Sequence, residues 1–134
     1  MSVPPTVLVV EDDADVRDVV LLVLNLNGFD ARGAADGAEA WQRLSDGLRP
    51  NVVLLDLRMP NMDGADLARR IQGHGELHAT PLVVMSGEIH GRQEAADLGV
   101  HAFLEKPVGM HDLLETIRRS LPPASDRCDL TCHP

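Results

Sequence analysis

Three continuous aliphatic runs recur along this chain, and they constrain its fold more than any other feature. The runs are Val7–Val10, Val52–Leu55 and Leu82–Met85. They do not alternate with polar residues, so each predicts a strand buried on both faces, as in a parallel sheet covered by helices on both sides. Shorter segments extend the pattern, and the full set of predicted strands is Thr6–Val10, Phe29–Gly33, Asn51–Leu55, Pro81–Met85 and Val100–Leu104.

Helical patterns separate these strands. One helix is expected to begin near Asp13–Asp15 and to end before Gly28, and its predicted face consists of Val16, Val19, Val20 and Val23. Further helices are expected after Asp36, after Asp63, over His90–Leu98, and from Met110 to Leu121 before Pro122-Pro123. Strands that alternate with helices predict an α/β protein with a doubly wound five-stranded parallel sheet and right-handed crossovers.

The length of 134 residues suits one domain with its own core, which we place at residues 1–121. Residues 122–134 have little apolar periodicity, and we expect them to form a disordered tail. Cys128, Cys132 and His133 of this tail supply too few ligands for a closed zinc site. We interpret them as reduced thiols and a histidine in a polar segment.

Charge and hydropathy exclude several classes of function. The formal net charge of −9 argues against direct binding of nucleic acid through a basic surface. No apolar run approaches the thickness of a bilayer, and the first residues lack a basic segment followed by an apolar stretch. The sequence therefore predicts a cytoplasmic protein that does not contact membranes and meets neutral or basic partner surfaces.

Polar residues follow four of the predicted strands. They are Glu11-Asp12-Asp13, Asp56, Ser86 and the pair Lys106-Pro107. Because the carboxyl ends of parallel strands lie along one edge of the sheet, where ligands bind, we expect these side chains to converge there.

The expected cluster has a chemistry of its own. Carboxylates crowded around Asp56 would repel one another unless a cation lies between them, and all-oxygen ligands favour a hard ion such as Mg²⁺. A carboxylate beside Mg²⁺ and a lysine is equipped to attack a phosphoryl group. Simpler interpretations remain open: Asp56 as a turn residue, Lys106 as a surface cation, and the Ser86 hydroxyl as the partner of a loop amide.

Four ordered motifs resemble the receiver domain of two-component response regulators. They are Val7–Val10 with Glu11-Asp12-Asp13, then Leu54–Gly64, Val83–Gly87 and Phe103–Pro107. The resemblance covers nearly the whole chain up to Leu121, and its most specific stretch is Asp56–Gly64. It implies a flavodoxin-like fold with strand order 2-1-3-4-5.

For the metal site, the resemblance implies that Asp56 is the phosphoacceptor. Asp12 and Asp56 would bind Mg²⁺ directly, together with the carbonyl oxygen of Arg58. Glu11 would assist through a water molecule.

For signalling, the resemblance implies that Lys106 contacts the phosphoryl group and that Ser86 reorients to form a hydrogen bond with it. Phe103 would be an aromatic switch that turns inward. The donor would be a phosphohistidine on a sensor histidine kinase or phosphotransfer protein. A downstream protein target would read the face formed by the fourth helix, Val100–Leu104 and the final helix.

Two features depart from the commonest pattern of that family. The acidic pair is Glu11-Asp12 rather than two aspartates, and the interval from Ser86 to Lys106 is short, so the fourth helix is expected to be small or irregular. We also hypothesise that Arg58 and Glu88, each two residues beyond a site residue, pair across the mouth of the pocket and tune phosphoryl lifetime. The alternative is two solvated charges, because an exposed pair contributes only about 0–1 kcal/mol.

Other functions fit the residues less well. A phosphoaspartate-forming hydrolase would need a general acid at the position of Arg58, which cannot donate a proton at neutral pH. A flavin or nucleotide site would need glycines and free amides where Glu11-Asp12-Asp13 lie. An interaction module independent of phosphorylation would not need the polar cluster. We therefore expect a switch rather than an enzyme, either alone or as the receiver part of a hybrid histidine kinase or larger regulator.

Overall fold

The structure is a computed structural model that describes residues 3–58 and 62–121. Strands and helices alternate in the order β1 Thr6–Val10, α1 Ala14–Leu26, β2 Asp30–Ala34, α2 Gly37–Ser45, β3 Val52–Asp56, α3 Gly64–Gln72, β4 Leu82–Ser86, α4 Gly91–Leu98, β5 Ala102–Glu105 and α5 Met110–Ser120. All strand pairs are parallel, in the order β2-β1-β3-β4-β5. The predicted doubly wound fold and strand order are confirmed. The predicted tail with Cys128, Cys132 and His133 lies outside the described residues.

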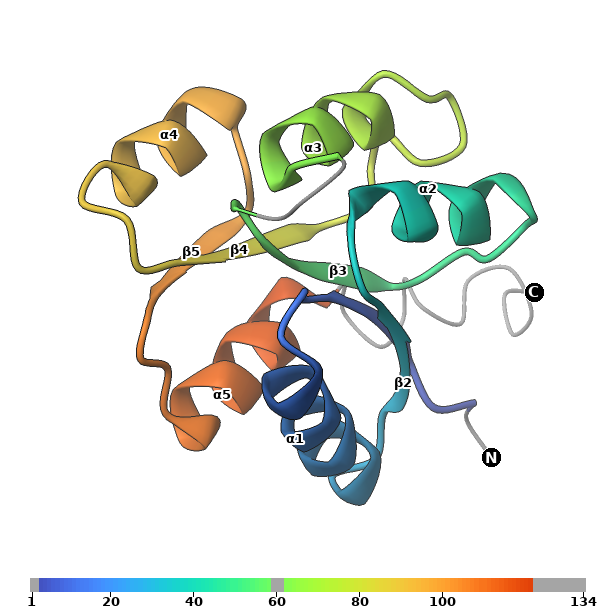
Figure 1. Cartoon of the computed structure of the whole chain (residues 1–134). Helices are drawn as coiled ribbons and strands as arrows, with labels where there is room; N and C mark the ends of the chain where they lie inside the picture. Colours follow the sequence, from blue (N-terminus) through green and yellow to red (C-terminus); the bar gives the residue numbers. More distant parts are fainter. Residues whose placement is uncertain (1–2, 59–61, 122–134) are drawn as a thin grey trace.

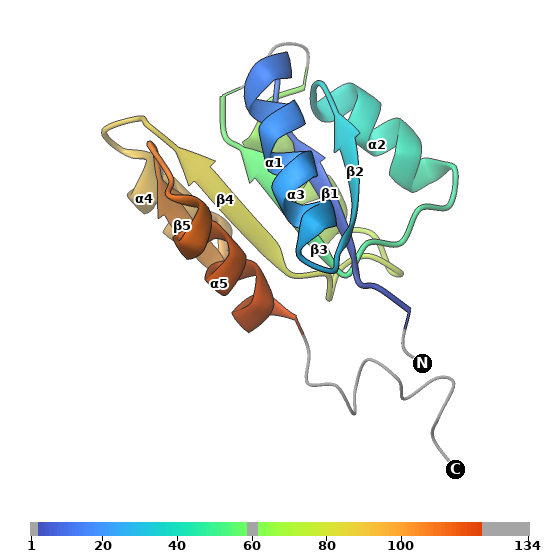
Figure 2. The same ribbon diagram turned by 90° about the horizontal axis from the view of Figure 1, so that it is seen from below.

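The sheet separates two hydrophobic layers. Helices α1 and α5 cover one face and α2, α3 and α4 cover the other (Figures 1 and 2). Strand β1 serves both layers, because Val7 and Val9 pack toward α1 and α5 whereas Leu8 and Val10 pack toward the other three helices. These four side chains are fully buried. The unbroken aliphatic runs therefore reflect strands with a helix layer on each side.

Three helices begin at aspartates, as predicted. Asp13 accepts hydrogen bonds from the amides of Asp15 and Val16, and Asp36 accepts one from the amide of Glu39 at 2.8 Å. Asp63 accepts one from the amide of Asp66 at 3.0 Å. Each of these side chains satisfies an amide that has no partner within its helix.

The buried face of α1 differs from the predicted one. Val20 and Leu24 are its buried residues, whereas Val16 and Val19 are 40% and 52% exposed. Aliphatic residues occupy every position from Val19 to Leu24, so hydrophobic periodicity does not single out one side of this helix.

Helix α4 is short and sparsely packed, as the short interval predicted. Its buried residues are Gly91 and Ala95, its first turn has no side-chain cap, and it ends at Gly99, whose φ is 71°. In the part of the chain that the structure describes, no helix is both long enough and apolar enough to cross a membrane.

Candidate functional site

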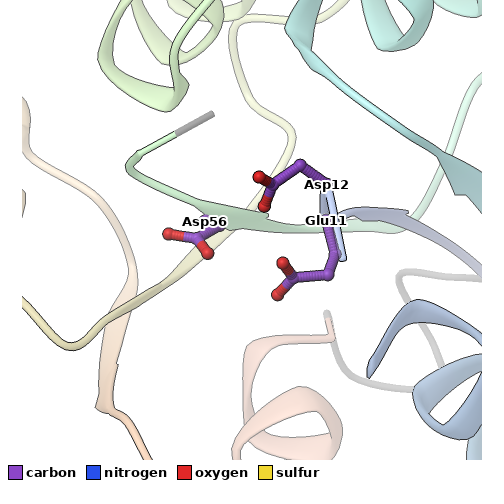
Figure 3. A group of neighbouring side chains, drawn as sticks. All are labelled: Glu11, Asp12 and Asp56. Carbon is purple, nitrogen blue, oxygen red and sulfur yellow. The ribbon is translucent and has the colours of Figure 1, made fainter. Parts of the chain in front are cut away.

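The polar residues predicted from the sequence lie at one edge of the sheet. Asp56 and Ser86 are the last residues of β3 and β4, and Lys106 directly follows β5. Glu11 and Asp12 directly follow β1, which pairs with β3. One carboxylate oxygen from each of Glu11, Asp12 and Asp56 lies within 4.8 Å of the other two (Figure 3).

Lys106 bridges two of these acids. Its Nζ donates to Oδ2 of Asp56 at 2.5 Å and to Oε1 of Glu11 at 3.1 Å. Its backbone amide donates to the carbonyl oxygen of Ser86 at 3.0 Å, which holds the start of the β5–α5 loop against the end of β4. The Lys106–Pro107 peptide bond is cis. The Lys106 side chain thus reaches from the end of β5 across the end of β4. There it contacts Asp56 at the end of β3 and Glu11 directly after β1.

The electrostatics of this group depend on burial. The Glu11 side chain is nearly inaccessible, and burial raises its pKa despite opposing hydrogen bonds from the Asp13 amide and the Lys106 ammonium. Burial is also the largest single influence on Lys106 and lowers its pKa. The hydrogen bonds and charges of Asp56 and Glu11 together outweigh it, and the net pKa of Lys106 is raised. Lys106 is therefore an ammonium ion at neutral pH.

Asp56 is fixed on two sides. Its second oxygen, Oδ1, accepts a hydrogen bond from the Arg58 amide at 3.1 Å. Gly64 packs directly against its backbone, because a Cβ atom at Gly64 would overlap the carbonyl oxygen of Asp56. The Gly64 amide also donates to the carbonyl oxygen of Leu57. Gly64 ends the Leu54–Gly64 motif, which by itself assigns it no role. Only the folded loop brings it against Asp56.

Ser86 and Phe103 lie on the side of the site that faces α4. The Ser86 hydroxyl is buried and accepts a hydrogen bond from the Glu88 amide at 3.0 Å, so it satisfies a loop amide in this state. A Cβ atom at Gly91 would lie 2.6 Å from the Ser86 hydroxyl and 3.4 Å from the Phe103 ring. The Arg92 guanidinium lies over that half-buried ring, 4.9 Å from its centroid. Gly91 and Arg92, the first residues of α4, thus pack against Ser86 and Phe103.

Arg58 and Glu88 also approach each other. Nε of Arg58 lies 3.8 Å from Oε1 of Glu88. A closer partner is Glu94 of α4, whose Oε1 accepts a hydrogen bond from a terminal nitrogen of Arg58 at 3.1 Å. Glu94 could not be found from the sequence, because no motif contains it and its position depends on how α4 packs.

The three carboxylates have the charge and the donor atoms that a metal ion requires. Three carboxylates and one ammonium leave a formal charge of −2 at this edge. All the acidic donors are oxygens, and Asp12 is exposed, so the group is open to solvent. Glu11 and Asp56 each accept one hydrogen bond from Lys106 and one from a backbone amide, and the exposed Asp12 lies beside them. This arrangement fits a hard divalent cation that keeps several of its waters.

The comparison with protein families agrees with the motifs. The family described as "Response regulator receiver domain" matches residues 7–118. Among curated proteins, "Response regulator MprA" of Mycobacterium sp. (strain KMS) is 32% identical, over 98% of this chain and 61% of its own length. "DNA-binding dual master transcriptional regulator RpaA" of Synechocystis is 29% identical, over 87% of this chain and 49% of its own length. The chain thus spans about half to three fifths of these relatives.

Solved structures agree in fold along nearly their whole length. The chemotaxis response regulator CheY4 of Vibrio cholerae superposes with a TM-score of 0.81 at 29% identity, covering 88% of this chain and 99% of that one. A response regulator receiver protein from Pseudomonas putida superposes with a TM-score of 0.80 at 36% identity, covering 89% and 99%.

Proposed function

Because this chain belongs to the response regulator receiver domain family, we propose that it is a phosphoacceptor switch in a two-component phosphorelay. An oxygen of Asp56 attacks the phosphorus of a phosphohistidine on a sensor histidine kinase or phosphotransfer protein. The P–N bond breaks, and the imidazole nitrogen keeps the electron pair and regains a proton. The observation that carries this proposal is the Lys106 ammonium bonded to Asp56 and Glu11 beside a third carboxylate.

Each acid has a distinct part in the proposal. As the family resemblance implies, Asp12, Asp56 and the Arg58 carbonyl would hold Mg²⁺ directly, and Glu11 would assist through a water molecule. Bound Mg²⁺ neutralises charge on the phosphoryl oxygens. Lys106 supplies a second positive charge to the same oxygens while it keeps the acceptor carboxylate oriented.

Ser86 and Phe103 form the proposed switch. The hydroxyl of Ser86 leaves the Glu88 amide to donate to a phosphoryl oxygen, and Phe103 moves into the space this opens. Ser86 and Phe103 both lie against Gly91, the first residue of α4, so their movement reaches that helix directly. A shift between two such packings needs only a few kcal/mol of differential contact. A downstream protein then binds the face of α4, β5 and α5.

Two features favour a switch over a hydrolase. Arg58 occupies the position where a hydrolase would need a general acid, and its guanidinium is paired with Glu94. Proteins of this family are generally not enzymes, and the proposed catalysis is limited to the chain's own phosphorylation and slow dephosphorylation. We further propose that residues 1–121 form the receiver unit and that the protein is cytoplasmic. Arg58 and Glu88 are proposed as a pair that tunes phosphoryl lifetime.

Mass spectrometry with a small-molecule phosphodonor tests the proposal. We expect the wild-type protein to gain one phosphoryl group in Mg²⁺ and none in EDTA. Asp56→Asn should gain none, whereas the control Asp46→Asn, at the end of α2, should behave like wild type. Continuous release of phosphate over many turnovers would instead indicate a hydrolase. No mass gain in the wild type would indicate an interaction module.

A further inference from the structure

Arg58 connects the acceptor residue to α4. Its backbone amide donates to Oδ1 of Asp56 at 3.1 Å, so its side chain begins beside the acceptor carboxylate. The guanidinium pairs with two acids outside the carboxylate cluster: Glu94 at 3.1 Å and Glu88 at 3.8 Å.

Glu94 is the better anchored of the two acidic partners. Its side chain is 29% exposed, against 54% for Glu88. Glu94 lies on the first turn of α4, whereas Glu88 lies in the loop before that helix. Both ends of α4 are held, since Gly91 packs against Ser86 and the carbonyl oxygen of Leu98 accepts a hydrogen bond from the Gln72 side chain at 2.7 Å.

We propose that Glu94 is a positioning residue for the phosphorylated site, because it holds the Arg58 guanidinium toward α4. Glu94 and a phosphoryl group on Asp56 then compete for that guanidinium. The inference rests on the proposed function, because the phosphoryl group is one of the two competitors. It adds a link between the acceptor and α4 that involves neither Ser86 nor Phe103.

The competition has a kinetic consequence. The phosphoaspartate is lost when a water oxygen attacks phosphorus, the bond from phosphorus to the Asp56 oxygen breaks, and inorganic phosphate leaves with the carboxylate restored. A guanidinium released from Glu94 can swing to the phosphoryl oxygens and cover the approach of that water. Removing the negative charge of Glu94 should therefore slow dephosphorylation.

The expected change is modest because the pair is partly exposed. Glu94→Gln should lengthen the phosphorylated lifetime by about twofold to fivefold, the range expected for an ion pair of this exposure. The matched control is Asp97→Asn on the same helix, which removes a charge that contacts Gln93 rather than Arg58. That control should keep the wild-type lifetime.

A double-mutant cycle separates positioning from a structural effect. In an Arg58→Gln background, Glu94→Gln should no longer change the lifetime, because no guanidinium remains to be released. Glu88→Gln, measured in parallel, shows how much of the effect belongs to the weaker partner. Thermal unfolding of each variant should match the wild type, since the substituted side chains are on the surface.

Each remaining result overturns the inference. If the wild type is phosphorylated but Glu94→Gln decays at the wild-type rate or faster, Glu94 does not restrain Arg58, and the proposed function stands. If Glu94→Gln slows the decay equally with and without Arg58, Glu94 acts by another route. If the wild type gains no phosphoryl group, the proposed function and the inference both fail.

Discussion

At the scale of single residues, Glu11 and Lys106 are the most constrained groups of the site. Glu11 is a buried carboxylate whose charge is balanced by a lysine that it shares with Asp56. Such an arrangement favours the binding of cations, but the burial of a carboxylate charge costs free energy of folding. The raised pKa of Glu11 reflects this cost of desolvation.

The desolvation of Glu11 predicts that the stability of the folded protein depends on pH. Since the pKa of Glu11 in the folded protein lies above its ordinary value of 4.5, the folded state binds the proton more tightly than the unfolded state. Stability therefore falls as pH rises from 4.5 through the raised pKa. Glu11→Gln removes this loss, so we expect the variant to be more stable than wild type at neutral pH in EDTA. The advantage should vanish below pH 4.5.

Urea unfolding at both pH values checks this expectation. The control is Glu115→Gln on α5, a half-exposed acid outside the site. A Glu11→Gln protein that is less stable than wild type at neutral pH would show that the ion pair with Lys106 outweighs the burial of the carboxylate.

At the scale of elements, the loop from β3 to α3 is held by contacts that allow no side chain at Gly64. Gly64→Ala places a methyl group against the carbonyl oxygen of Asp56, which is backbone and cannot rotate away. We expect a loss of about 1–3 kcal/mol in the free energy of unfolding, as for other overpacked sites. Because the end of β3 must shift, phosphorylation should slow as well.

The chain offers a matched control for this change. A Cβ atom at Gly75 would meet no atom within 4 Å, so Gly75→Ala should stay within about 0.5 kcal/mol of wild type. Chemical denaturation and the mass gain from a phosphodonor measure the two effects. Equal stability of Gly64→Ala and Gly75→Ala would mean that the loop adapts without disturbing β3.

The elements themselves were predictable because their signals are local. Aliphatic runs marked β1, β3 and β4, and Asp13, Asp36 and Asp63 marked helix starts through side-chain contacts only two or three residues away. Strand β1 has the predicted bounds, whereas β2 to β5 each end one residue later than predicted, so that Asp56 and Ser86 belong to their strands. The exposed side of α1 was not predictable, because tertiary packing rather than periodicity selects it.

At the scale of the whole molecule, parallel topology brings the site together. Residues far apart in the chain converge because four strands end at one edge, and this much follows from the sequence. The contacts of Arg58 with Glu94 and of Gly91 with Ser86 depend on where α4 packs, which no motif encodes. The sequence therefore predicted which groups gather at the edge but not how α4 contacts them.

In the proposed switch, the carboxylate of Asp56 becomes covalently bound to phosphorus. Borohydride reduction of the phosphorylated protein, followed by peptide mapping, tests it most directly, since an acyl phosphate is reduced to an alcohol while an ordinary carboxylate is not. We predict that Asp56 is converted to homoserine in the sample treated with Mg²⁺ and phosphodonor, and in no other sample. An intact Asp56 in a protein that carries phosphorus, with the phosphoryl group on a histidine, on Ser86 or on another acid, would show that Asp56 is not the acceptor.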